Sequence, residues 1–167
     1  MSLVLIPAFG LSIFAQKQSA IETVKSFYKF HNSRSGIFSL HEVKLRRKWF
    51  TAELYKLFLN EIKREDEFVK KNPNDKPHFG DGFPLQPFSE CVIDEKVINN
   101  SYEAKEISSD TTKATVEVKF YSPEKCEKDL LDTYKVELVK TRNVWLINDW
   151  IYSDNSRLTT DLKRKDY

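Results

Sequence analysis

The chain has 167 residues, which is enough for one domain with a hydrophobic core and too few for two. Its 27 basic and 25 acidic residues leave a net charge of +2, a balance that does not favour nucleic acid or another polyanion as the partner. Aromatic residues make up 13% of the chain, so few side chains are needed to close a core or to line a pocket.

The N-terminal residues 1–15 contain no charged side chain. This apolar run is too short to span a bilayer as a helix, and Pro7 and Gly10 interrupt it. It is typical of a secretory signal peptide cleaved after Ala15, although no Lys or Arg precedes it, so the basic start of the signal is atypical or lies upstream. We expect an exported protein, periplasmic or secreted, with a signal peptide over 1–15, one domain over 16–167 and no transmembrane span. A buried N-terminal strand is the alternative.

Helical periodicity dominates the first half of the domain. Ser19, followed three residues later by Glu22, forms a capping box, and apolar residues then repeat at helical spacing as far as His31. Thr51 is a suitable N-cap for a longer helix. The sequence predicts helices over residues 19–31, 40–50 and 52–71, and a short terminal helix over 156–165.

In the second half the apolar residues alternate with a period of two, which indicates strands. The alternation is clearest in 112–121, where Val116 and Val118 share one face and Glu117 and Lys119 the other. Strands are predicted over residues 91–98, 102–107 and 112–121, and as a final pair within 131–152 that turns at 140–143. Helices followed by a meander of strands predict an α+β domain whose N-terminal helices pack on one face of an antiparallel sheet.

Several chemistries lack their motifs in this chain. It has only four glycines, with no glycine-rich phosphate loop and no G-x-S-x-G element. His31, His41 and His78 do not have the spacing of a metal pair, and two cysteines cannot form a zinc knuckle. We therefore expect no metal and no cofactor.

Cys91 and Cys126 are the two cysteines. In an exported protein they could form a disulfide across a loop of about 35 residues, which would stabilise the fold by roughly 3–4 kcal/mol. The alternative is that Cys91 is a small core residue and Cys126 a surface thiol.

Asp149 is the candidate catalytic residue. It shares the strand parity of Trp145 and Ile147, so it would face an apolar cavity if that side is the core. Burial would raise its pKa and suit it to act as a general base or to anchor a ligand. Alternatively the strand ends there and leaves Asp149 in water, or the carboxylate pairs with Arg46 or Arg47. The opposite face of this strand is equally apolar, so the pattern does not orient it.

Asp81 lies between two glycines and could approach a ligand closely, although such a residue more often holds a turn. The basic cluster 44–48 could receive an anionic partner, but the balanced net charge favours a solvated helix face. Aromatic side chains from the helices and the loop 78–88 either line a cavity or pack between helix and sheet. The candidate pocket residues are Tyr28, Trp49, Asp81, Phe83, Trp145, Asp149 and Tyr152.

Three stretches carry a resemblance to a known family. They are the first helix around 20–28, the Gly-Asp-Gly-Phe-Pro loop at 80–84, and the segment 145–149 with the downstream residues Tyr152, Leu158 and Leu162. Over about residues 18–165 the chain resembles the cystatin-like α+β fold of the nuclear transport factor 2-like superfamily. More narrowly, it resembles an exported bacterial family, domain of unknown function 3828.

This resemblance implies a cone-shaped, curved antiparallel sheet wrapped around a helix, often with a pocket between them. It also implies that a dimer often forms through the outer sheet face. The fold hosts isomerases, dehydratases and many non-catalytic modules, so it implies no single activity. The Asp–His pair of the enzymatic relatives has no counterpart in this sequence.

Three functional hypotheses follow. The leading one is a non-catalytic exported module that binds a small molecule, a peptide or a partner protein through the cavity or the sheet face. Strand 144–152 is apolar on both faces, so a homodimer through the outer sheet face would supply its cover. The second is an acid–base enzyme of the isomerase or dehydratase type with Asp149 as base. The third is an inhibitor or immunity-type protein that binds through the loop 72–88.

Overall fold

The computed structural model describes residues 18–34, 36–88, 91–126 and 128–164; the expected signal peptide lies outside this part of the chain. The helices are α1 (Ala20–Asn32), α2 (Leu40–Arg46), α3 (Ala52–Lys71) and α4 (Leu158–Asp161), with short 3-10 turns η1 (Arg47–Trp49) and η2 (Glu124–Cys126). The strands are β1 (Val92–Ile93), β2 (Lys96–Val97), β3 (Ser101–Ser109), β4 (Lys113–Tyr121), β5 (Leu130–Thr141) and β6 (Val144–Ile151).

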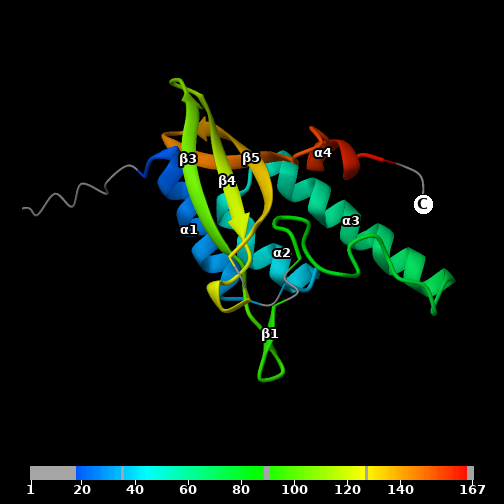
Figure 1. Cartoon of the computed structure of the whole chain (residues 1–167). Coiled ribbons are helices and arrows are strands. Elements are labelled where there is room, and N and C mark those ends of the chain that lie inside the picture. The colour runs from blue at the N-terminus through cyan, green and yellow to red at the C-terminus, as the bar shows by residue number, and fades with distance from the viewer. Residues whose placement is uncertain (1–17, 35, 89–90, 127, 165–167) are drawn as a thin grey trace, which may run out of the picture.

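The larger sheet has the order β3-β4-β5-β6, and every neighbouring pair is antiparallel. It curves strongly, with α1 against one face and the long α3 extending away beside β6 (Figure 1). The predicted α+β class, with N-terminal helices on an antiparallel sheet, is confirmed.

The predicted helix starts are confirmed by their hydrogen bonds. At α1 the backbone N–H of Glu22 donates to Ser19 Oγ (3.3 Å), and the backbone N–H of Ser19 donates to Glu22 Oε2 (2.7 Å). At α3 the backbone N–H of Leu54 donates to Thr51 Oγ1 (3.2 Å). Each cap satisfies a donor that the first helical turn leaves without a partner.

The core lies between α1 and the concave face of the sheet. The inward residues of β4 are Ala114, Val116, Val118 and Phe120, all buried as the alternation predicts. The hydroxyl of Tyr28 joins three parts of the fold, because it donates to the backbone oxygen of Leu85 (2.8 Å) and accepts from Trp150 Nε1 (2.9 Å). This pairing explains how a buried Tyr and a buried Trp keep their polar atoms satisfied.

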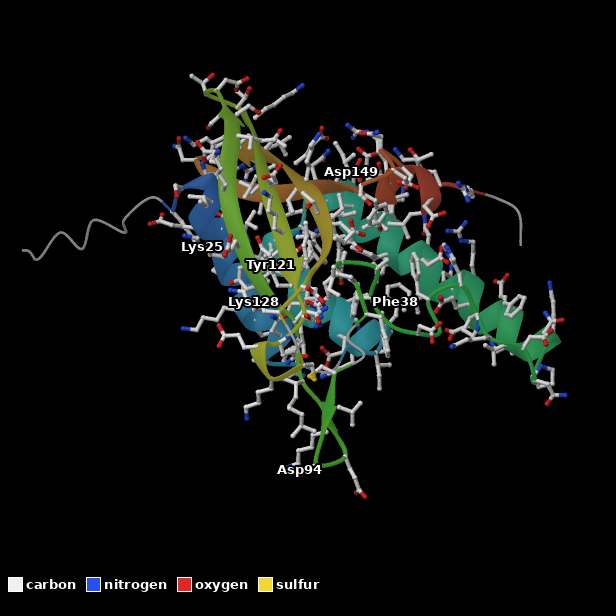
Figure 2. The ribbon with its side chains drawn as sticks, viewed as in Figure 1. Lys25, Phe38, Asp94, Tyr121, Lys128 and Asp149 are labelled. Carbon is white, nitrogen blue, oxygen red and sulfur yellow. A yellow bond between two sulfur atoms is a disulfide. The ribbon has the colours of Figure 1, made fainter. Side chains whose placement is uncertain are left out.

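The strand predicted over 91–98 is wrong as a single strand. Residues Asp94 and Glu95 have positive φ angles (50° and 63°) and turn the chain back, so Val92 pairs with Val97. The resulting hairpin of β1 and β2 projects from the body with Asp94 at its tip (Figure 2). Two consecutive left-handed residues fit a two-residue hairpin turn; aspartate is a usual first residue of such a turn, but Glu95 stands where glycine is usual.

A β-bulge in β6 changes the side on which Asp149 lies. Leu138 pairs with Ile147, whereas the preceding residue Glu137 pairs with Asp149, so Asn148 is an extra residue in the strand. The bulge places Asp149 on the side of Glu137 and turns Trp150 into the core. The assumed shared parity of Asp149 and Ile147 is therefore wrong, because strict alternation stops at an inserted residue.

Cys91 and Cys126 form a disulfide with their Cα atoms 5.8 Å apart. The bond joins the start of the β1–β2 hairpin to η2, the turn that follows β4. Because β3 begins directly after the hairpin, the disulfide holds the entry of β3 near the exit of β4.

Replacing both Cys91 and Cys126 by serine should lower the free energy of unfolding by about 3–4 kcal/mol, since the unfolded chain loses a loop constraint of 35 residues. Urea unfolding followed by circular dichroism measures this. Reduction of the wild type should reproduce the loss and leave the double variant unchanged. A loss below about 1 kcal/mol would contradict the prediction.

Candidate functional site

Asp149 is a structural anchor and does not face a cavity between helix and sheet. Its carboxylate accepts hydrogen bonds from the backbone N–H of Trp150 (2.9 Å), from Arg157 Nη1 (2.8 Å), and from the backbone N–H and hydroxyl of Thr159 (2.9 and 2.8 Å). Figure 2 shows Asp149 beside α4, far from Lys25 on α1. Asp149 is neither exposed nor paired with Arg46 or Arg47, the two alternatives considered from sequence. Its hydrogen bonds instead hold the C-terminal segment against β6.

Most of the other candidate pocket residues fill the core. Tyr28, Trp49 and Trp145 are buried, and Tyr152 donates from its hydroxyl to the backbone oxygen of Pro84 (3.0 Å). The expected cavity in this region is occupied by packed aromatic rings. The remaining candidates, Asp81 and Phe83, lie in the wall of a groove described below.

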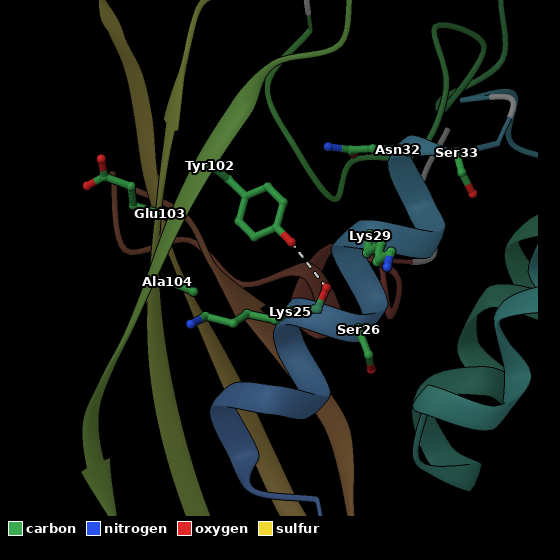
Figure 3. Close-up of a pocket in the computed structure, with 8 residues that line it drawn as sticks. All are labelled: Lys25, Ser26, Lys29, Asn32, Ser33, Tyr102, Glu103 and Ala104. Atoms are coloured by element: carbon green, nitrogen blue, oxygen red, sulfur yellow. Dashed lines mark hydrogen bonds between the residues drawn. The ribbon is translucent and has the colours of Figure 1, made fainter.

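A first groove, the α1–β3 groove, runs between α1 and the edge strand β3 with a volume of about 860 Å³ (Figure 3). Its surface is mostly apolar, with two lysines on the helix side. The lining residues are Lys25, Ser26, Lys29, Asn32, Ser33, Tyr102, Glu103 and Ala104.

Tyr102 sets the separation between the helix and the strand. Its ring packs on Tyr28 with the centroids 5.2 Å apart, and its hydroxyl donates to the backbone oxygen of Lys25 (3.1 Å). Figure 3 shows Ala104 pointing toward the helix and Glu103 pointing away. Glu103 instead accepts a hydrogen bond from Tyr121 on the other face of the sheet (3.3 Å). Lys25 and Lys29 are therefore the charged side chains on the groove side.

The outer edge of β3 pairs with no strand in the described part of the chain. Every residue from Lys105 to Ser109 is exposed, and a bulge at Ile107 interrupts the pairing with β4. An edge strand presents the N–H and C=O groups of alternate residues outward. The groove is thus bounded by backbone groups that can pair with a further strand.

A second groove, the His31 groove, lies between the end of α1 and the loop 78–88 with a volume of about 510 Å³. The backbone N–H of Phe83 donates to the backbone oxygen of Gly36 (2.9 Å), and Gly82 adopts a φ of +127° that favours glycine. The lining residues are His31, Gly36, Ile37, His78, Phe79, Asp81, Gly82, Phe83, Pro84, Gln86, Pro87, Phe88 and Asn99.

A buried charged network stands behind this groove. Arg46 is fully buried; it donates from Nε to His31 Nδ1 (3.0 Å) and from Nη1 to Glu42 Oε2 (2.6 Å). Its guanidinium lies over the ring of Phe83 at 4.4 Å, and Arg34 also donates to Glu42 (2.9 Å). The basic cluster 44–48, interpreted from sequence as a solvated face, therefore contains a core arginine.

This network determines the charge of His31 and which of its ring nitrogens carries the proton. Burial, and then the positive charge of Arg46, lowers the pKa of His31 to about 3, so the ring is neutral near pH 7. Since Nδ1 accepts from a guanidinium that keeps its proton, the ring proton must lie on Nε2. No residue that the structure describes accepts from this Nε2–H.

Amide groups near the His31 groove also lack partners. The Oε1 atom of Gln86, in the groove wall, is buried without a hydrogen bond. Asn32 Oδ1 and Asn100 Oδ1 are likewise without one, but neither residue lines this groove, and both use their amide nitrogens to hold backbone oxygens. Buried amide oxygens without partners are uncommon and indicate where a ligand donor would be favourable.

Within the described residues no group of three or more His, Cys, Asp or Glu is placed to hold a metal ion. Among the same residues no helix combines the length and apolarity needed to cross a membrane. Comparisons with protein families, with curated proteins and with solved structures find no match to this chain.

Sequence reasoning named Asp81 and Phe83 of the His31 groove but missed the other residues that line the two grooves. His31 falls on the apolar face of α1, which indicates that it is buried. Glu42 lies four residues before Arg46, a spacing that favours an ion pair on one helix face. No periodicity marks Tyr102, Lys25 or Gln86, because their role depends on which strand becomes the sheet edge.

The free energy of unfolding should fall by about 2 kcal/mol between pH 7 and pH 5 because of His31. Its folded pKa of about 3 lies below the ordinary value of 6.5, so in this interval the unfolded chain gains a proton that the folded chain does not. Glu42, whose pKa Arg34 and Arg46 hold at about 2, loses its contribution only below its ordinary value of 4.5. Urea unfolding at both pH values measures the change.

The His31→Gln variant should lose most of this pH dependence, because glutamine does not titrate. The matched control is His41→Gln, at an exposed position of α2, which should keep the wild-type dependence. Equal slopes in the two variants would contradict the assignment to His31.

Proposed function

We propose that this chain is a non-catalytic binding module that receives an extended peptide in the α1–β3 groove, as an additional strand beside β3. The observation that carries the proposal is the free edge of β3 next to a helix-walled groove. Peptides that add to a sheet edge bind through main-chain hydrogen bonds, and pockets for alternate side chains supply the specificity.

The side chains of the groove favour a particular peptide. In an added strand every second side chain points toward α1, where Ala104 and Tyr102 provide apolar surface. Lys25 and Lys29 are exposed one helical turn apart and face the same space. We therefore propose a peptide that places an apolar and an acidic residue two positions apart.

The contacts of Ser26 and Asp149 do not favour catalysis at the α1–β3 groove. The hydroxyl of Ser26 donates to the backbone oxygen of Thr23 (2.9 Å) and accepts from Trp49 Nε1 (3.0 Å), so no general base activates it. The isomerase or dehydratase hypothesis required Asp149 in a pocket, and that carboxylate is held by Arg157 and Thr159. These contacts support binding over turnover.

The loop 72–88 is less suited to be an inhibitory loop than the third hypothesis assumes. Phe79, Phe83 and Leu85 point inward and are buried. An inhibitor loop presents its side chains to the partner, whereas this loop uses its apolar residues to close the core.

A homodimer through the outer sheet face is also less favoured. The outward residues of β3, β4 and β5 are mainly charged and include Glu103, Lys105, Glu117, Lys119, Lys135 and Glu137. Large homodimer interfaces are usually more apolar than this.

Export and membership of the nuclear transport factor 2-like superfamily remain proposals. A disulfide between Cys91 and Cys126 supports export, because such bonds persist in oxidising compartments.

Selection from a library of short random peptides tests the proposed function. Enriched sequences should carry an acidic and an apolar residue two positions apart. Binding of an enriched peptide should protect amide protons of β3 from exchange and should weaken with salt, since lysines contribute to it. Changing Lys25 and Lys29 together to glutamate should weaken binding at least about tenfold.

The matched control is Lys135→Glu, an exposed lysine on the outer face of β5. This variant should bind the peptide as the wild type does. Amide protection on β5 or β6 rather than β3, or an equal loss in the control, would refute strand addition at this groove.

A further inference from the structure

We infer that the His31 groove is a second binding site, for small molecules in which an amide group is attached to an apolar body. The inference does not rest on the proposed peptide site, because the two grooves share no lining residue. It rests on polar atoms without protein partners in an apolar, aromatic groove.

His31 supplies a hydrogen-bond donor to the ligand. The side chain is only 2% exposed, and its Nδ1 is used by Arg46. The Nε2–H is therefore the one polar group that the ring can offer to the groove, and it has no acceptor among the described residues. Because no described side chain or backbone oxygen accepts from it, a carbonyl oxygen that enters the groove gains a hydrogen bond with this N–H.

Gln86 supplies the complementary group. Its terminal amide makes no hydrogen bond within the described part of the chain, and its Oε1 is buried. Because Gln86 lines the groove, its amide oxygen is the acceptor that we assign to a ligand N–H. An amide ligand carries both a carbonyl oxygen for His31 and an N–H for Gln86, whereas a carboxylate satisfies His31 alone.

The apolar body of the ligand has a matching surface. Phe79 and Phe83 form the buried base of the groove, while Phe88 (71% exposed) and Ile37 (67% exposed) stand at its rim. Large exposed apolar side chains that gather at a concave site are typical of ligand contacts. Covering them gains about 25 cal/mol for each Å² removed from water.

The geometry allows His31 to bind a ligand but not to act as a general base. To act as a base, the ring would need a free nitrogen lone pair, and the only one, on Nδ1, faces the guanidinium of Arg46. Protonation there would place two cations in contact in a buried site. The groove is therefore suited to hold an amide and not to transfer its proton.

Three probes that share a phenyl ring test the inference: phenylacetamide, phenylacetate and phenethylamine. Titration followed by NMR, including the Nε2–H resonance of His31, gives the affinity and the location of each. Phenylacetamide should bind tightest, phenylacetate more weakly, and phenethylamine, which has no acceptor, at least about tenfold more weakly than the amide. Only the first two should shift the His31 resonance.

Two variants distinguish an effect on ligand binding from an effect on folding. His31→Gln keeps an acceptor for Arg46 and a donor for the groove, so it should retain the preference for phenylacetamide. The double variant Ile37→Ser and Phe88→Ser alters exposed positions and should fold normally but bind phenylacetamide at least about fivefold more weakly. The control Val144→Ser removes another exposed apolar side chain (56%), on β6, and should have no effect.

Several results would overturn the inference. Equal affinity for the three probes, no binding of phenylacetamide, or shifts confined to the α1–β3 groove would each do so. Tighter binding of phenylacetate than of phenylacetamide would assign the groove to carboxylates and refute the amide preference.

Discussion

The buried guanidinium of Arg46 is the interaction on which one half of this structure depends. Removing a charge from water costs several kcal/mol, and that cost is offset only where the charge is paired and its N–H groups have acceptors. Here Glu42 supplies the opposite charge, His31 an imidazole nitrogen, and Phe83 an aromatic face. Because these partners come from α1, α2 and the loop 78–88, the charge can be buried only when all three elements are in place.

The same network explains why His31 can offer only a hydrogen-bond donor to its groove. A histidine with two free nitrogens could present either a donor or an acceptor to a ligand. Arg46 removes this choice, since it occupies Nδ1 from behind, and it does so from a position that the solvent does not reach. The chemistry of the groove is therefore decided by a residue that does not line it.

Much of the fold is predictable because local signals suffice for it. The capping box of Ser19 and Glu22 and the alternation through β4 depend on neighbours in sequence, and both are confirmed. Asp149 was misplaced because the bulge at Asn148 inserts one residue, and a period of two cannot reveal an insertion. Arg46 was misjudged because composition makes a run of basic residues look solvated, whereas one of them meets its partners only in three dimensions.

The bulge at Asn148 accounts for part of the two-sided apolarity of β6, which suggested a dimer, because it brings Trp145, Ile147 and Trp150 onto the core face. Phe50 forms a bridge with Ile147, and Arg157 forms one with Ile151, so the free edge of β6 is covered by segments of the same molecule. Within the described residues, no segment covers the opposite edge of the sheet, at β3, in this way. A sheet edge is an aggregation risk that proteins usually blunt with charges or bulges, and β3 has both: Lys105 and Glu106, and the bulge at Ile107.

These charges and the bulge lie at residues 105–107 and blunt only that part of the edge. Beside α1, at Tyr102, a different contact keeps the space between helix and strand open. The bond from the hydroxyl of Tyr102 to the backbone oxygen of Lys25 spans the space between strand and helix, and the ring is fixed against Tyr28. The helix cannot close onto the strand without displacing this ring from the core. These contacts of Tyr102 hold the helix and the strand apart, so the α1–β3 groove stays open with Lys25 and Lys29 on its helix side.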